Sequence, residues 1–206
     1  MSRSMRAYIF IFFILSTVAH ICHAIEKKAL LARLGPIEFQ RLRIAAEASI
    51  SSERNKEVPI HVDENQSFHL TLDEKINLNL IPVVFNSLRA NNDVCVLTVF
   101  SKTNQLIETI PLLYVRGDAD EVVESCVGVQ AVTTYYRDRQ QLLIYLLRYR
   151  AGNQYGDRVV VSAVEPDKVR PLPHLTACVS QKTRLDSMAR VRGAINKCRP
   201  GREKSR

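Results

Sequence analysis

The sequence predicts a mainly β protein, an antiparallel sandwich or barrel of about eight or nine strands with an N-terminal helical arm and a C-terminal basic helix. Three observations support this fold class. Apolar and polar residues alternate through much of residues 58–165, as in half-buried strands. Turn-forming residues separate the alternating runs at intervals typical of a sandwich or barrel. Helix-like patterns are confined to the two ends of the chain.

These patterns divide the 206 residues into four parts. The predicted parts are a signal peptide (1–24), a helical arm with a polar linker (25–56), a β domain (58–165), and an extended connector followed by the basic helix (166–206). A mature chain of this length suits one domain with a sizeable core.

The first part has the layout of a secretory signal peptide. Arg3 and Arg6 precede an apolar run, and Cys22 and Ala24 occupy the positions of a small-residue cleavage site. The alternative is an uncleaved anchor, but a membrane-spanning helix needs about 20 predominantly apolar residues, and polar residues interrupt this run. We therefore expect a secreted or periplasmic protein whose mature chain starts at Ile25.

The helical arm is predicted to contain two helices. Residues 26–34 combine helix formers with an apolar stripe, and Gly35 with Pro36 then breaks the chain. Pro36 suits the start of a second helix over 37–48.

The β domain shows a period of two from residue 58 onwards. Pro82 limits its own segment to an edge position or a strand start, because proline cannot donate to a sheet ladder. Apart from the second arm of the hairpin described next, the predicted strand segments are 58–62, 67–72, 75–81, 94–100, 106–110, 112–115, 122–136 and 158–165. The residues predicted to be mostly buried are Phe68, Leu70, Leu78, Leu80, Val96, Leu97, Val99, Val132, Leu143, Ile144 and Val160.

Residues 132–153 contain an apolar run that could be a helix or one arm of a β-hairpin. Abundant leucine favours a helix. The sequence before the run is strand-like, and a short polar connection joins the two segments. Both features favour the hairpin, which we predict. If Tyr136 pairs with Gln141, Val132 faces Tyr145. An arm that is apolar on both faces is expected to be a central strand.

Four cysteines follow the cleavage site: Cys95, Cys126, Cys178 and Cys198. An even number behind a secretion signal indicates two disulfides, with three connectivities possible. We favour Cys95–Cys126, within strand-like sequence, and Cys178–Cys198, around the basic segment. The alternatives are four reduced cysteines or a zinc site, and the absence of a Cys-x-x-Cys pair disfavours zinc.

The C-terminal part is predicted to be extended through its prolines and then helical over 181–197, with apolar residues every three to four positions. Residues 182–206 hold nine basic and two acidic residues, so the high pI of about 9.4 comes from this segment. The tail could neutralise an anionic surface, or it could be a solubilising helix docked by its apolar stripe.

The predicted binding residues combine the tail with the hairpin connection, where arginine lies beside tyrosine as in many recognition surfaces. The alternative is a hairpin whose tyrosines cap the sandwich. The expected partner is an anionic macromolecule, a membrane surface or an acidic protein, and no nucleic acid is expected. The predicted binding residues are Arg184, Arg190, Arg192, Lys197, Tyr136, Arg137 and Arg139.

The sequence therefore favours a non-enzymatic interaction module, with no catalytic residues, metal or cofactor expected. Two alternatives stay open. A secreted hydrolase could use His61, Asp63 and His69, which with Glu64 could also converge on a metal. A structural subunit of an envelope or surface assembly could associate through its sheet edges.

Overall fold

The computed structural model of the chain describes residues 29–52, 60–72, 76–87, 92–112 and 124–198. The predicted signal peptide (1–24) and most of the predicted strand 112–115 lie outside the described residues. Within them, no helix is long and apolar enough to cross a membrane.

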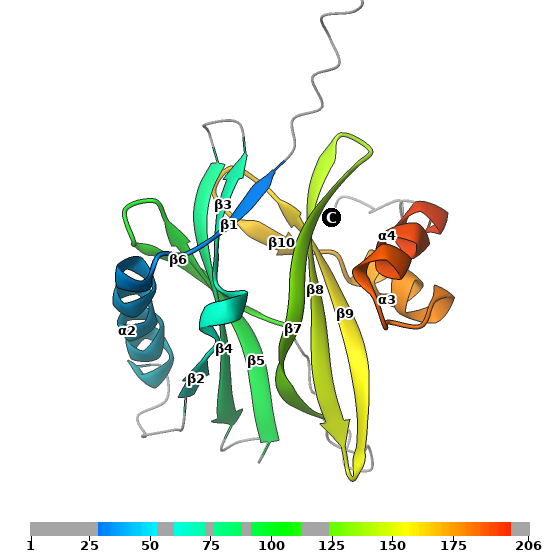
Figure 1. The fold of residues 1–206 in the computed structure, drawn as a ribbon, viewed down its shortest axis with the longest axis horizontal. Helices are drawn as coiled ribbons and strands as arrows, with labels where there is room; N and C mark the ends of the chain where they lie inside the picture. Colours follow the sequence, from blue (N-terminus) through cyan, green and yellow to red (C-terminus); the bar gives the residue numbers. More distant parts are fainter. Residues whose placement is uncertain (1–28, 53–59, 73–75, 88–91, 113–123, 199–206) are drawn as a thin grey trace, which may run out of the picture.

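The described strands form two antiparallel sheets, which confirms the predicted fold class (Figure 1). In the six-stranded sheet, here called sheet A, the order is β1-β3-β4-β5-β6, and β2 also pairs with β4. In the four-stranded sheet B the order is β10-β9-β8-β7. Sheet A consists of β1 (Leu30–Arg33), β2 (Ile60–Val62), β3 (Phe68–Leu72), β4 (Ile76–Ser87), β5 (Asn92–Ser101) and β6 (Leu106–Pro111). Sheet B consists of β7 (Glu124–Arg137), β8 (Gln140–Ala151), β9 (Gln154–Val164) and β10 (Val169–Pro171).

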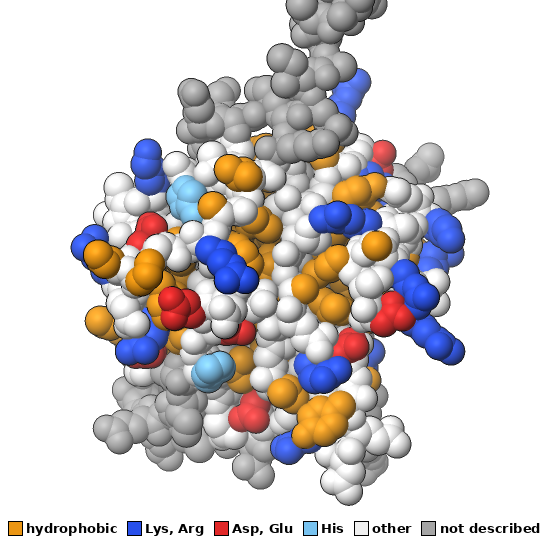
Figure 2. Space-filling model, viewed as in Figure 1, with side chains coloured by type: hydrophobic (Ala, Val, Ile, Leu, Met, Phe, Trp, Pro, Cys, Tyr) orange, Lys and Arg blue, Asp and Glu red, His pale blue; other side chains and the backbone are white. Residues whose placement is uncertain are grey.

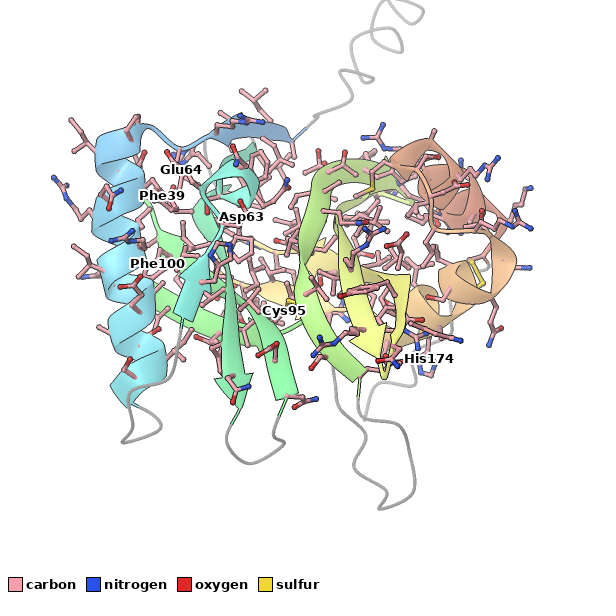
Figure 3. All side chains as sticks on the ribbon, turned by 60° about the horizontal axis from the view of Figure 1, so that its bottom comes forward. Phe39, Asp63, Glu64, Cys95, Phe100 and His174 are labelled. Atoms are coloured by element: carbon pink, nitrogen blue, oxygen red, sulfur yellow. A yellow bond between two sulfur atoms is a disulfide. The ribbon has the colours of Figure 1, made fainter. Side chains whose placement is uncertain are left out.

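Helices cover the outer faces of both sheets, so the molecule has four layers (Figure 1). Helix α2 (Pro36–Ser52) packs on sheet A, and helices α3 (Pro173–Lys182) and α4 (Met188–Lys197) pack on sheet B. A short 3-10 helix, η1 (Glu64–Gln66), connects β2 to β3. Figure 3 shows Phe39 of α2 and Phe100 of β5 between α2 and sheet A, and Cys95 between the two sheets.

This layering explains why the central strands are apolar on both faces. On β8, Leu143 and Tyr145 belong to the core between the two sheets, whereas Leu142 and Ile144 belong to the core beneath α3 and α4. Successive side chains of a strand point to opposite faces, so each face of β8 meets a different apolar layer. Burying a leucine or isoleucine side chain contributes about 1.5–3 kcal/mol, which makes this strand a major source of stability.

The hairpin prediction is confirmed together with its register. Tyr136 lies opposite Gln141, and Val132 lies opposite Tyr145. The two connecting residues, Asp138 and Arg139, have φ angles of 51° and 63°. Positive φ at both positions is the requirement of the type I′ turn, whose twist matches that of the flanking strands.

The predicted helix over residues 26–34 is wrong in its described part. Leu30–Arg33 forms β1, which pairs with β3 along the edge of sheet A. So short a segment gains little as an isolated helix, while strand pairing satisfies its backbone groups. The second predicted helix is confirmed in kind, and it extends from Pro36 to Ser52.

Pro82 does not mark an edge or a strand start, because β4 runs unbroken from Ile76 to Ser87. Two short strands share the side of β4 that faces away from β5. The β3 ladder ends where Phe68 meets Leu80, and the β2 ladder ends where Val62 meets Val83. Pro82 therefore lies at the junction of two ladders, where a missing N–H costs little.

The C-terminal prediction needs three corrections. The connector includes a strand, because β10 pairs with β9, and α3 begins at Pro173, well before the predicted helix. Proline is tolerated in the first helical turn, where its missing N–H would have no partner. The predicted helix over 181–197 is broken between α3 and α4, and Ser187 caps α4 by accepting a bond from the backbone N–H of Arg190 (3.4 Å).

Both predicted disulfides are present. Cys95–Cys126 joins β5 to β7 and so links the two sheets through the central core, with both residues fully buried. Cys178–Cys198 joins α3 to the end of α4. Of the predicted core residues, Phe68, Val132 and Val160 are only half-buried. The others are buried: Leu70, Leu78, Leu80, Val96, Leu97, Val99, Leu143 and Ile144.

Candidate binding surface

The structure places α4 beside the tip of the β7–β8 hairpin (residues 135–140), and one arginine joins them. The Arg137 guanidinium group donates hydrogen bonds to the carbonyl oxygens of Ile195 and Cys198. The last carbonyl groups of a helix have no partner within the helix, so a cationic donor at this end satisfies them and also opposes the negative end of the helix dipole. Arg137, predicted as a binding residue, thus has a structural role at the C-terminus of α4.

Further contacts extend along the same side of the helix. The Tyr135 hydroxyl donates to Oδ1 of Asn196 (2.8 Å). Arg192 donates through Nη2 to Oγ1 of Thr133, with the carbonyl oxygen of Thr134 at 3.5 Å. Hydrogen bonds and the Cys178–Cys198 disulfide therefore anchor α4 in addition to its apolar contacts.

The predicted tail residues lie at both ends of α4. Arg184 and Arg190 are near its N-terminus and Lys197 is in its last turn. Arg190 pairs with Asp186, but both side chains are more than half exposed, so the pair contributes little to stability. Arg184, Lys197 and Arg139 of the hairpin tip are exposed and form no ion pair within the described residues. Figure 2 shows lysine and arginine side chains along the side where α3 and α4 lie.

Tyr136, another predicted binding residue, does not share this surface. It lies opposite Gln141, whereas Tyr135 lies opposite Leu142, which packs under the helices. Neighbouring residues of a strand face opposite sides of a sheet, so Tyr136 faces away from α4. The contacts of Tyr135 and Thr133 with α4 were not predicted from the sequence. The only signal for them was the predicted register, which placed Tyr135 opposite Leu142.

One arginine, Arg158, contacts a tyrosine at the far end of the hairpin. The Arg158 guanidinium lies 4.7 Å from the centre of the Tyr149 ring and is paired with Glu124. The hydrogen bond to Glu124 is the main reason that the pKa of Arg158 is raised. Arg148 pairs with Asp157 at 3.5 Å. Arg148 and Arg158 are therefore both paired with carboxylates, whereas Arg184 and Lys197 near α4 form no ion pair within the described residues.

The hydrolase candidates are divided between the two faces of sheet A. His61 and Asp63 line a groove of about 250 Å³ between β4 and β7 that also includes Val84 and Arg148. His69 lies on the other face, where its Nδ1 is 2.6 Å from Oδ1 of Asn79, whose side-chain amide donates toward Glu38 of α2 (3.4 Å).

Asp63 has a local role in this groove, because its Oδ1 accepts the backbone N–H of Asn65 and caps η1 (2.9 Å). Glu64 is exposed on that turn, and Figure 3 shows both carboxylates there. Within the described parts of the chain, no three His, Cys, Asp or Glu side chains are grouped to hold a metal ion. The arrangement thus supplies no nucleophile–base pair from the predicted trio.

Comparison with protein-family models, curated proteins and solved structures found no match to the chain. The class of protein therefore follows from the fold and the surface alone. The structure defines a mainly β module with two disulfides and helices on both outer faces. Such disulfides are compatible with an oxidising compartment outside the cytosol.

Proposed function

We propose that the protein is an exported, non-enzymatic interaction module that binds an anionic partner through a basic surface formed by Arg139, Arg184, Arg190, Arg192 and Lys197, called here the α4 surface. The observation that carries the proposal is the anchoring of α4. Its apolar side is buried, and Arg137 and the Cys178–Cys198 disulfide hold its C-terminal end. The cationic side chains are thereby presented to solvent from a fixed helix.

Charge distribution supports the same surface. The basic excess of the mature chain lies in residues 182–206, and the described part of that segment is α4 with the turn before it. A local concentration of positive charge raises the encounter rate with an anionic partner and suppresses wrong partners more than it stabilises the fold. Export is supported by the signal-like N-terminus and by the pairing of all four remaining cysteines.

Charge reversal tests the proposal. In co-sedimentation at low salt, the variant R190E/R192E/K197E should lose binding to whichever probe the wild-type protein binds, polyanionic glycan or anionic vesicles. High salt should weaken the wild-type interaction, because the Debye length falls from about 10 Å at 0.1 M to about 3 Å at 1 M.

The matched control is R33E/K102E/R150E, which makes the same charge change at three exposed cations elsewhere on the molecule. The control should bind like the wild type and melt at a similar temperature, since exposed charges contribute little to stability. R190E/R192E/K197E should stay folded with a small decrease in melting temperature, because Arg192 also bonds to Thr133 and Thr134. Equal loss in both triple variants would show a net-charge effect, and no binding by the wild type would refute the proposed function.

A further inference from the structure

We infer that the anionic partner of the α4 surface is a linear polyanion, a sulfated or carboxylated polysaccharide chain, and not a flat anionic membrane. The inference rests on the proposed function and narrows it to one class of ligand. It depends on where the cations lie around the helix and on where the exposed apolar side chains lie.

The cations of α4 are on two flanks of the helix. At 3.6 residues per turn, Arg190 and Lys197 are about 20° apart around the axis, whereas Arg192 is about 140° from Lys197. The buried residues Val191, Ala194 and Ile195 define the side toward sheet B. Arg192 therefore lies toward β7, as its bonds to Thr133 and Thr134 show, and Arg190 and Lys197 lie on the opposite flank.

A plane resting on the exposed crest of an anchored helix meets the cations of the two flanks less closely than a chain that bends around the helix. A flexible chain can pass over the exposed crest and contact cations on each side. Arg192 is suited to this role because both of its hydrogen bonds use Nη2, which leaves the other guanidinium donors for a ligand. The Nε and Nη1 donors of Arg192 can each donate to an oxygen of a carboxylate or sulfate group, because a guanidinium stays charged and donates through several N–H groups.

Membrane association of a helix at an interface normally inserts apolar side chains as well as using basic ones. The apolar side of α4 is buried against sheet B and is not available for insertion. Among the described residues, none of the large exposed hydrophobic side chains is on α3, on α4 or at the hairpin tip. These side chains are Leu30, Ile37, Ile44, Leu106, Ile107, Val127 and Tyr155.

The experiment compares two probes on the full mature chain. One probe is heparin, as a polysulfated polysaccharide, and the other is vesicles of phosphatidylcholine with phosphatidylserine, both titrated at low and high salt. The variants are R192Q, K197Q and the double variant, with R150Q as the control for one lost exposed charge. R192K restores the charge and serves to separate charge loss from altered packing, and melting temperatures verify folding.

We expect tighter binding to heparin than to vesicles at equal anionic charge. Each single variant should weaken heparin binding about two- to five-fold, the effect of one exposed ion pair. The double variant should show the product of the two effects, since distant sites act additively. R150Q should bind like the wild type, and R192K should bind more tightly than R192Q.

Vesicle binding as tight as heparin binding would overturn the inference while leaving the proposed function in place. So would loss confined to one flank, with the variant of the other flank binding like the wild type. If neither probe binds the wild-type protein at low salt, the proposed function itself is refuted and the inference with it.

Discussion

The guanidinium group of Arg137 donates a hydrogen bond to the carbonyl oxygen of Cys198, the residue that ends α4 and that a disulfide ties to α3. One contact thus connects the hairpin turn of sheet B to the covalently fixed end of the basic helix. The same guanidinium is paired with Asp138 in the turn (2.9 Å), so its orientation is set from both sides.

Arg137→Ala should destabilise the protein more than its position next to a turn would suggest. The side chain is only 14% exposed, and its removal leaves the helix carbonyls without their cationic donor. Hydrogen bonds to charged groups contribute about 1.5–3 kcal/mol, and we expect a loss of this size in urea unfolding. Arg139→Ala, at the exposed neighbour, is the control and should change stability little. Equal midpoints for the two variants would contradict the role assigned to Arg137.

The two disulfides should be reduced in a defined order. Cys95 and Cys126 are fully buried between the sheets, whereas Cys178 is half-buried on α3. Thiol–disulfide exchange needs access for the attacking thiolate, so limited reductant should open Cys178–Cys198 first. Alkylation followed by mass spectrometry measures the order, and the untreated exported protein should take up no alkylating reagent. Simultaneous labelling of all four cysteines in the folded protein would count against this prediction.

Gly193→Ala should stabilise the protein. Gly193 is exposed within α4, and an added Cβ would meet no atom within 4 Å. Glycine costs a helix interior about 0.5–1 kcal/mol relative to alanine, so the melting temperature should rise. For Gly152→Ala we expect a lower melting temperature. Gly152 has a φ of 58° in the β8–β9 turn, where a Cβ is unfavourable. A higher melting temperature in both variants, or in neither, would contradict the prediction that backbone conformation sets the effect at each glycine.

Tyr145→Phe should maintain or raise stability at neutral pH. Tyr145 is fully buried in the central core, and its hydroxyl has no hydrogen-bond partner among the described residues. A buried polar group without a partner costs about 1–3 kcal/mol, and phenylalanine removes it without leaving a large cavity. Thermal unfolding tests this, with the exposed Tyr155→Phe as control. A clear loss of stability at neutral pH would show that the hydroxyl has a favourable contact.

The same residue should also make the fold sensitive to alkali. Burial raises the pKa of Tyr145 well above its ordinary value of 10.0. The unfolded chain then releases this proton at lower pH than the folded chain, so stability falls as pH rises above the ordinary value. Tyr145→Phe should therefore show a shallower loss of stability in that alkaline range than the wild type. Unfolding midpoints measured across the range will decide this, and identical slopes would contradict it.

Several features could be predicted from the sequence because they depend on local or covalent constraints. The hairpin register follows from two arms joined by a two-residue turn, so Val132 necessarily meets Tyr145 once the turn is placed. The disulfide pairing could be favoured over the two other connectivities, because two cysteines lie in strand-like sequence and two lie on either side of a helix-like segment. Within residues 132–153, the second arm of the hairpin is apolar on both faces, which already indicated a central strand.

Other features were decided only by tertiary structure, because they depend on which distant segment lies alongside. Leu30–Arg33 becomes a strand because β3 offers it a free edge, and Pro82 is accommodated because two short strands meet beside it. His61 and His69 are separated by the sheet between them. Arg137 was recognisable as part of a basic surface, but its bonds to the end of α4 exist only because the helix packs across sheet B, a long-range contact that no local pattern encodes.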